Sequence, residues 1–200
     1  MIKNIVFDLG KVLLDFCPEK YLERKIPKDV CERVYEDMFL SKEWIMLDRG
    51  VISEKQAIAD IIARDKEMEK YIECAFDNWY ELLKPIEKNV DILRKLKDKN
   101  YNVYYLSNFH DLAFKYVNKK YSFFKLFDGG IVSYKEKLLK PEKEIYEALL
   151  DTYSLVSEEC LFIDDTKVNI DAAGKLKIKG IHLDKADNLE KYLKCYDISV

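Results

Sequence analysis

Residues 4–10 read Asn-Ile-Val-Phe-Asp-Leu-Gly, a short apolar run that ends in a carboxylate and a glycine. Apolar runs of this length, rich in β-branched and aromatic side chains, are typical of strands that are buried on both faces of a sheet. The glycine that follows is typical of a turn. We therefore predict a first strand at residues 4–7, with Asp8 at its carboxyl end.

Beyond Pro85 the sequence alternates between helical and strand patterns. Strands are predicted at residues 102–106, 130–133, 160–163 and 179–183, and helices at residues 86–97, 112–119, 142–152, 168–176 and 189–194. Such alternation is typical of a parallel sheet whose strands are joined by right-handed helical crossovers. The predicted fold class is α/β, with a three-layer, Rossmann-like parallel sheet as its core.

Between these two parts, residues 17–85 show helical periods. Apolar side chains recur at four-residue spacing, as in Val30, Val34 and Met38, and Pro85 closes the stretch because the residue before a proline avoids the helical conformation. The chain is therefore predicted to form a core domain from residues 1–16 and 86–200, split by an inserted all-helical domain at residues 17–85.

The composition excludes several classes of protein. The chain has 200 residues, with 34 Lys and Arg against 37 Asp and Glu, whereas nucleic-acid binders are usually basic. No apolar run approaches the roughly 18 residues of a membrane span, and no signal peptide is evident. The five cysteines are scattered without a CxxC pair, as is common for thiols in a reducing cytoplasm. We predict a cytoplasmic protein with neither nucleic acid nor membrane as partner, and leave monomer and homodimer open.

Polar side chains follow the predicted strands at the edge where parallel sheets bind ligands. They come from four segments: Asp8, Ser107-Asn108, Lys140-Pro141 and Asp164-Asp165. Each alone is more typical of a helix cap or a turn. Together they would place three carboxylates, an ammonium and a hydroxyl on one edge, and clustered carboxylates need a cation to offset their repulsion. The sequence therefore favours a functional site over four unrelated turns.

The chemistry of these groups suits phosphoryl transfer. Ligation by carboxylate oxygens alone favours a hard cation such as Mg²⁺ over zinc. The metal and Lys140 would offset the charge of a phosphate beside an anionic nucleophile, and a carboxylate can attack phosphorus to form an aspartyl-phosphate. The Ser107 hydroxyl and the backbone N–H of Asn108 suit the phosphoryl oxygens.

Four segments carry a resemblance through their order and spacing. They are Phe7-Asp8-Leu9-Gly10-Lys11-Val12-Leu13, Leu106-Ser107-Asn108, Lys140-Pro141-Glu142 with Ile145-Tyr146, and Phe162-Ile163-Asp164-Asp165 with Asn169. Over nearly its whole length the chain resembles the haloacid dehalogenase-like (HAD) hydrolase superfamily, in subfamily IA with a helical C1 cap. The segment Asp48-Arg49-Gly50 and the Asp-Leu-Gly start are most similar to the bacterial α-D-glucose-1-phosphate phosphatase-like branch.

The resemblance implies a role for each residue. Asp8 would be the catalytic nucleophile, assisted by Lys140. The phosphoryl group would be held by Ser107, Asn108 and Lys140. The ligands of Mg²⁺ would be Asp8, the carbonyl of Gly10, Asp165 and, through metal-bound water, Asp164.

In the cap, Arg49 and Gly50 would lie on the loop that closes over the substrate, a small phosphorylated metabolite such as a sugar phosphate. A solvated turn is the equally open alternative for Arg49, because exposed arginines near a glycine turn are common.

Gly10 is the main departure from the superfamily pattern. Most phosphatases of the superfamily carry a second Asp at this place, which protonates the leaving group, and general acid–base catalysis is typically worth about 10²–10⁴-fold. The departure leaves open a slow enzyme, a substrate with a good leaving group, or replacement by Asp15 or a substrate group. The segment before Lys140 also lacks a glycine that is often found there.

Other functions and residues stay open beside this reading. A non-catalytic protein that binds a phosphorylated ligand or a protein partner is favoured by the missing Asp, whereas a haloacid dehalogenase or a phosphomutase fits the motifs less well. His110 could face the site, and His182 is more typical of a structural position. The cap aromatics are more typical of a core than of a sugar pocket; they are Tyr35, Phe39, Trp44, Phe76, Trp79 and Tyr80.

Overall fold

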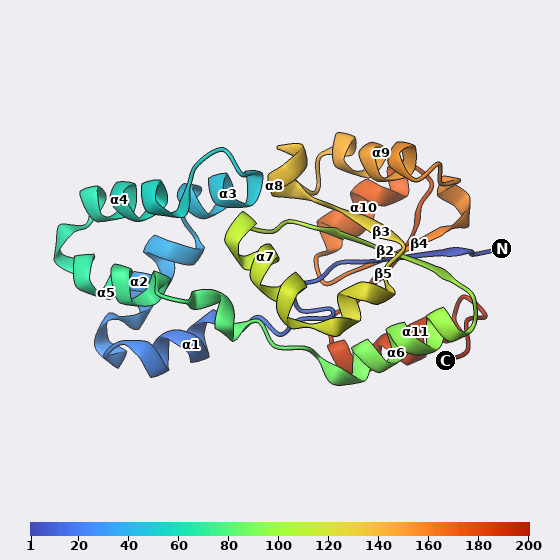
Figure 1. The fold of residues 1–200 in the computed structure, drawn as a ribbon, viewed down its shortest axis with the longest axis horizontal. Coiled ribbons are helices and arrows are strands. Elements are labelled where there is room, and N and C mark those ends of the chain that lie inside the picture. Colours follow the sequence, from blue (N-terminus) through green and yellow to red (C-terminus); the bar gives the residue numbers. More distant parts are fainter.

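A five-stranded parallel sheet lies at the centre of the core (Figure 1). The computed structural model describes residues 1–186 and 188–200, together with the backbone of residue 187. The strands are β1 (Asn4–Phe7), β2 (Asn102–Ser107), β3 (Gly129–Val132), β4 (Cys160–Asp164) and β5 (Lys179–His182), in the order β3-β2-β1-β4-β5. The predicted α/β fold is confirmed, and the strand positions agree with the prediction to within a residue.

Helices cover both faces of this sheet. The core helices are α6 (Glu87–Asp98), α7 (Asp111–Lys120), α8 (Ser133–Glu136), α9 (Lys143–Thr152), α10 (Lys167–Lys175) and α11 (Leu189–Lys194), with 3₁₀ turns η4 (Ser122–Leu126), η5 (Ser157–Glu159) and η6 (Ala186–Asn188). Successive side chains of a strand point to opposite faces. Val6 accordingly shares an apolar cluster with Tyr146 of α9, whereas Phe7 shares one with Leu93 of α6 and Leu193 of α11. Figure 1 shows the resulting three layers.

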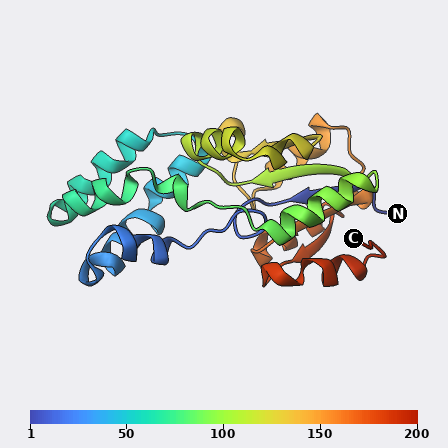
Figure 2. The same cartoon turned by 60° about the horizontal axis from the view of Figure 1, so that its bottom comes forward.

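A group of helices lies beyond the carboxyl ends of the strands (Figures 1 and 2). It consists of α1 (Pro18–Lys25), α2 (Cys31–Phe39), α3 (Lys42–Arg49), α4 (Glu54–Arg64) and α5 (Glu69–Phe76), with 3₁₀ turns η1 (Lys28–Val30), η2 (Lys66–Met68) and η3 (Trp79–Leu82). We call residues 17–85 the cap. Its buried Val34, Met38 and Ile72 continue one apolar cluster of the core. The boundaries at residues 16 and 86 stay a prediction.

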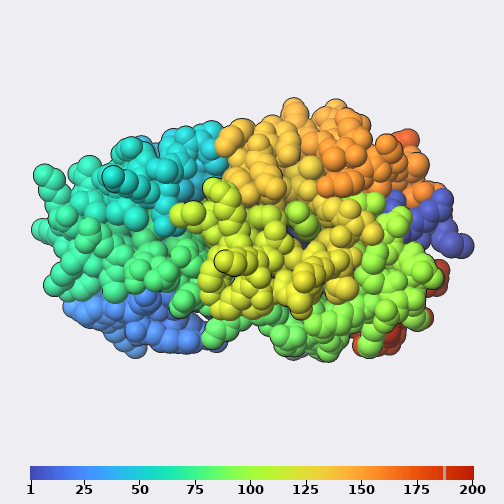
Figure 3. Space-filling view, in the orientation of Figure 1, coloured from blue at the N-terminus to red at the C-terminus, as the bar shows by residue number. Residues whose placement is uncertain are grey.

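The chain enters and leaves the cap through two segments that lie side by side. The backbone N–H of Asp15 donates to the carbonyl of Lys84 at 2.7 Å, and the N–H of Ile86 donates to the carbonyl of Leu13 at 2.8 Å. Among the described residues, no helix is long and apolar enough to cross a membrane. In the space-filling view the cap packs directly against the core (Figure 3). Hydrogen bonds join the cap to the segment that follows β3, at the carboxyl ends of the strands.

Candidate active site

Two strand ends place the carboxylates side by side. Asp8 follows β1 directly, and its backbone N–H donates to the carbonyl of Ile163 at 2.8 Å, which extends the pairing of β1 with β4 by one residue. Asp164 ends β4, and Asp165 follows it. The three carboxylates each offer an oxygen, and these oxygens lie within 4.8 Å of one another. The structure brings these groups together, as the sequence predicts, because strand polarity fixes which residues share an edge of a parallel sheet.

Lys140 reaches this cluster from the loop between α8 and α9. Its Nζ lies 2.8 Å from Oδ1 of Asp8 and 2.6 Å from Oδ2 of Asp164, and its side chain is 2 % exposed. Burial alone would lower the pKa of Lys140, but the two carboxylates outweigh burial and raise it. The ammonium is therefore charged at neutral pH and stands between two acids.

The backbone of Lys140 is positioned by Asn108. The N–H of Lys140 donates to Oδ1 of Asn108 at 2.8 Å, and Nδ2 of Asn108 donates to the carbonyl of Lys140 at 3.1 Å. The Asn108 side chain is thus used to hold the loop, so its backbone N–H is the part of the residue suited to a phosphoryl oxygen. Ser107 is buried, its hydroxyl donates to the carbonyl of Asn108 at 3.5 Å, and it lowers the pKa of Asp8.

Asp164 is fixed by hydrogen bonds on its far side. The N–H of Thr166 donates to Oδ1 at 2.7 Å, and Nδ2 of Asn169 lies 3.1 Å from both oxygens. The Tyr146 hydroxyl in turn donates to the carbonyl of Asn169 at 3.0 Å. A fully buried carboxylate needs such partners, and they leave its orientation no freedom.

The acids of the cluster repel one another, and a bound cation would offset this repulsion. The pKa of Asp8 is raised to about 6, because burial and the neighbouring Asp164 raise it more than Lys140 and Ser107 lower it. Burial and then Asp164 also raise the pKa of Asp165, against the effect of Lys11. Three carboxylates against one ammonium leave an excess of negative charge. The all-oxygen donor set and this charge fit a hard divalent cation such as Mg²⁺.

Arg49 and Gly50 lie against α8 and the loop after it, away from the carboxylates. Nη1 of Arg49 donates to the carbonyl of Lys137 at 3.0 Å, and the guanidinium pairs with Glu142. Gly50 ends α3 with φ +69°, and a Cβ there would lie 2.4 Å from the carbonyl oxygen of Tyr134. These residues fasten the cap to the loop that carries the active-site lysine.

A small cavity of about 140 Å³ lies between the cap and the core, beside the loop that follows Asp8. Gly10 and Asn108 line it from the core, and a Cβ on Gly10 would meet no heavy atom within 4 Å. The cap aromatics Trp44 and Trp79 line it from above, whereas Phe39 and Phe76 are buried in the cap. The aromatics thus divide between a pocket and the cap core.

Two further residues meet at this cavity. Asp48, in the last turn of α3, has Oδ1 3.3 Å from Nε2 of His110, which directly precedes α7. Burial and the neighbouring Asp8 raise the pKa of Asp48 to about 8, against the effect of Lys140. Burial lowers the pKa of His110 to about 3. Asp48 was missed from the sequence because its burial depends on the cap packing onto a distant part of the chain.

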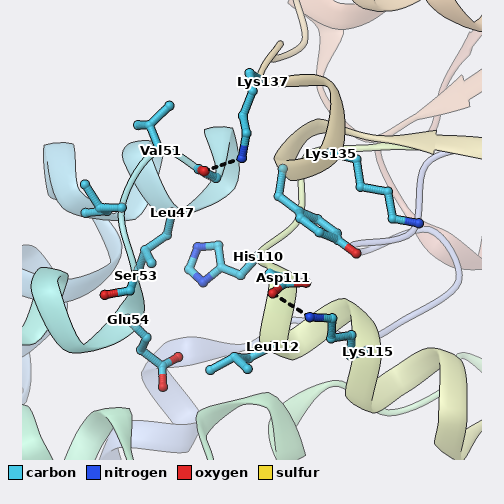
Figure 4. A pocket seen from close by; sticks show the side chains of 13 residues that line it. Leu47, Val51, Ser53, Glu54, His110, Asp111, Leu112, Lys115, Lys135 and Lys137 are labelled. Carbon is cyan, nitrogen blue, oxygen red and sulfur yellow. Dashed lines mark hydrogen bonds and ion pairs between the residues drawn. The ribbon is translucent and has the colours of Figure 1, made fainter.

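His110 also lines a larger surface pocket of about 820 Å³ (Figure 4). This pocket lies between the cap segment that begins at Gly50 and the helices α7 and α8, and the Lys137 ammonium donates to the carbonyl of Gly50 at its rim. His110 therefore stands in the walls of both cavities. Ser133, predicted to end a strand, instead begins α8, where its hydroxyl accepts from the N–H of Phe109 and donates to the carbonyl of Asp48.

The chain is similar to known proteins over most of its length. A family model of haloacid dehalogenase-like hydrolases matches residues 2–176. The sesquiterpene phosphatase astK of Aspergillus oryzae is 26% identical over 181 residues, which cover 90% of this chain and 89% of the relative. The D-ribitol-5-phosphate phosphatase of Bacteroides thetaiotaomicron is 25% identical over 185 residues, which cover 85% and 86%.

A solved structure gives the same picture. The HAD family enzyme bt-2542 of Bacteroides thetaiotaomicron, in complex with magnesium and inorganic phosphate, matches with a TM-score of 0.72 and 27% identity, covering 90% of this chain and 93% of that one. With the family match spanning strands β1 to β4, the cap and every motif of the carboxylate cluster, the chain belongs to the haloacid dehalogenase-like hydrolases.

Proposed function

We propose that this enzyme is an Mg²⁺-dependent phosphatase that hydrolyses a small phosphorylated metabolite through an aspartyl-phosphate on Asp8. The observation that carries the proposal is the Lys140 ammonium, held 2.8 Å from Asp8 and 2.6 Å from Asp164 in a cluster that fits a divalent cation. Two relatives named as phosphatases and a related structure with magnesium and phosphate support it.

The residues divide the work by charge and position. Asp8 attacks phosphorus, because Asp164, the other carboxylate beside the ammonium, is already held by hydrogen bonds from Thr166 and Asn169. Lys140 neutralises the phosphoryl oxygens, and the Ser107 hydroxyl and the Asn108 backbone N–H bind them. The metal would be held by Asp8, Asp164, Asp165 and the Gly10 carbonyl. When bound, it supplies positive charge that offsets the phosphoryl group and favours the ionised form of Asp8.

The cap would complete the site by excluding water. Residues 17–85 would move as a unit about the paired segments at Leu13 and Lys84, and Arg49 and Gly50 would fasten the closed position. The 140 Å³ cavity and its aromatic lining suit a compact leaving group, so short alkyl phosphates stand beside sugar phosphates as candidate substrates. All five cysteines are free thiols, which fits the expected cytoplasmic location.

Phosphate release is the test. The wild type, Asp8→Asn and the matched control Asp151→Asn, an exposed acid on α9, are assayed on alkyl, sugar and aryl phosphates with and without Mg²⁺. We expect release by the wild type and the control with Mg²⁺, and a loss of at least about 10³-fold in Asp8→Asn because the nucleophile is gone. Release that is equal in Asp8→Asn and the wild type, or equal without the metal, would contradict the proposal.

A further inference from the structure

The space beside Gly10 faces a carboxyl group that comes from the cap. Gly10 provides no side chain to the 140 Å³ cavity, and a Cβ there would meet nothing within 4 Å. Asp48 lines the same cavity from the opposite side. The core thus has an empty space at the position where the resemblance leads us to expect a proton donor, and an acid from the cap lines that space.

Asp48 is held in place by the core. Its carbonyl accepts a hydrogen bond from the Ser133 hydroxyl, which itself accepts from the N–H of Phe109. Its carboxyl lies 3.3 Å from Nε2 of His110, at ion-pair distance but without hydrogen-bond geometry. The His110 ring is packed against Trp44 and Trp79, with ring centroids 4.1 Å and 5.0 Å away. These contacts fix the acid without using up its proton.

The charges around Asp48 keep it protonated. The charged groups that act on its pKa from the core are Asp8 and Lys140, and the His110 ring lies 3.3 Å from its carboxyl. Its pKa is raised to about 8 by burial and Asp8, and that of His110 is lowered to about 3 by burial. A buried pair of this kind is more stable with both groups neutral than as separated charges. At neutral pH the cavity wall therefore holds a carboxylic acid at Asp48, while Asp8 is a carboxylate, the division of roles that general acid catalysis requires.

The other candidate acid lies elsewhere. Asp15 accepts a hydrogen bond from the Cys17 thiol at 3.2 Å, and it lines a separate surface pocket with Lys20 and Lys84. It belongs to the segment that connects core and cap, so the structure does not place it at the Gly10 cavity.

Resting on the proposed phosphatase function, we propose that Asp48 is the general acid of the reaction, positioned by His110, in place of the acid that Gly10 lacks. In the first step Asp8 forms a bond to phosphorus, the bond from phosphorus to the ester oxygen breaks, and the proton of Asp48 passes to that oxygen to release an alcohol. In the second step water forms a bond to phosphorus, its proton passes to Asp48, and the bond to Asp8 breaks. Phosphate leaves, and both acids return to their starting states.

The dependence on the leaving group tests this role. Propyl phosphate has a poor leaving group that needs a proton, whereas p-nitrophenyl phosphate has one that leaves without help. In Asp48→Asn we expect kcat for propyl phosphate to fall about 10²–10⁴-fold, and kcat for p-nitrophenyl phosphate to fall less than about tenfold. In Arg49→Met, which loosens the same end of the cap without facing the cavity, we expect both rates to change by the same factor.

Each outcome decides between the two proposals. An equal loss on both substrates in Asp48→Asn would overturn the role of Asp48 and leave the phosphatase standing. No phosphate release by the wild type from any substrate with Mg²⁺ would overturn the phosphatase and the inference together. If Asp48→Asn does not fold, the wild type alone gives the answer. With an acid in place, kcat falls only shallowly across aryl phosphates of increasing leaving-group pKa, and a steep fall would refute it.

Discussion

Replacing Asp48 by Asn should stabilise the protein increasingly as the pH rises. The unfolded carboxyl titrates at its ordinary pKa of 3.8, and the folded one at about 8. A raised pKa in an acid means that the folded state binds the extra proton, so stability is lost as the pH rises from about 4 towards 8. Asn imitates the protonated acid at every pH and removes that loss.

The size follows from the shift. Each pH unit inside the window costs the wild type at most about 1.4 kcal/mol, which gives an upper bound of about 4 kcal/mol between pH 5 and pH 8. The Asp48 side chain is 19% exposed, so solvent screens part of this penalty and we expect about half of that bound, on the order of 2 kcal/mol. Burial lowers the pKa of His110, so this group reduces stability as the pH falls below 6.5, in the opposite direction to Asp48. His110 is present in both proteins, so its contribution cancels in the comparison.

The assay is urea unfolding at pH 5, 6.5 and 8, without Mg²⁺ or phosphate. The quantity of interest is the free energy of unfolding of Asp48→Asn minus that of the wild type. Asp151→Asn serves as the control and should show a difference near zero at every pH, because this acid is exposed. A difference for Asp48→Asn that stays constant from pH 5 to pH 8 would refute the reasoning, since it would mean that Asp48 is ionised in the folded protein.

Three other changes test other parts of the molecule. Mg²⁺ at one hundred times its Kd should raise the free energy of unfolding of the wild type by about 2.7 kcal/mol, and that of Asp165→Asn by much less. The corresponding rise in melting temperature is followed by thermal unfolding with increasing Mg²⁺. Arg49→Met should lower stability by less than about 1 kcal/mol but lower kcat/KM several-fold, whereas Arg33→Met, which breaks an ion pair inside the cap, should leave kcat/KM unchanged. Gly130→Ala should destabilise by about 1–3 kcal/mol in urea unfolding, because the new Cβ would lie 2.3 Å from the Tyr105 ring; a neutral effect would show that the ring moves freely.

The parts that sequence could predict are those set by local pattern. The run at residues 4–7 and the alternation after residue 85 fix the strands and their polarity, and polarity alone places Asp8 beside Asp164. Lys140 could be expected at the same edge of the sheet, because its loop follows β3 and α8, although β2 separates β3 from β1.

The parts that sequence could not predict depend on how the cap meets the core. Asp48 gains its burial from a contact with residues about 60 to 85 positions later, which no local period encodes. Ser133 reads as the end of a strand, but it is the first residue of a short helix, and its hydroxyl joins Phe109 to Asp48. The Asn108 side chain likewise has a role that only the fold reveals, since its partner is the backbone of Lys140.

The cap forms hydrogen bonds with the loop that carries Lys140, at one residue before the lysine in the sequence and one after it. Arg49 binds the carbonyl of Lys137 before it and the carboxylate of Glu142 after it. Docking of the cap therefore also positions the loop that carries the Lys140 ammonium. In the proposed phosphatase, opening the cap would remove this clamp, and Asn108 would be left as the residue that positions the backbone of Lys140. Enclosing the substrate would then complete the proposed site, and a phosphorylated molecule too large to be enclosed would meet an incomplete one.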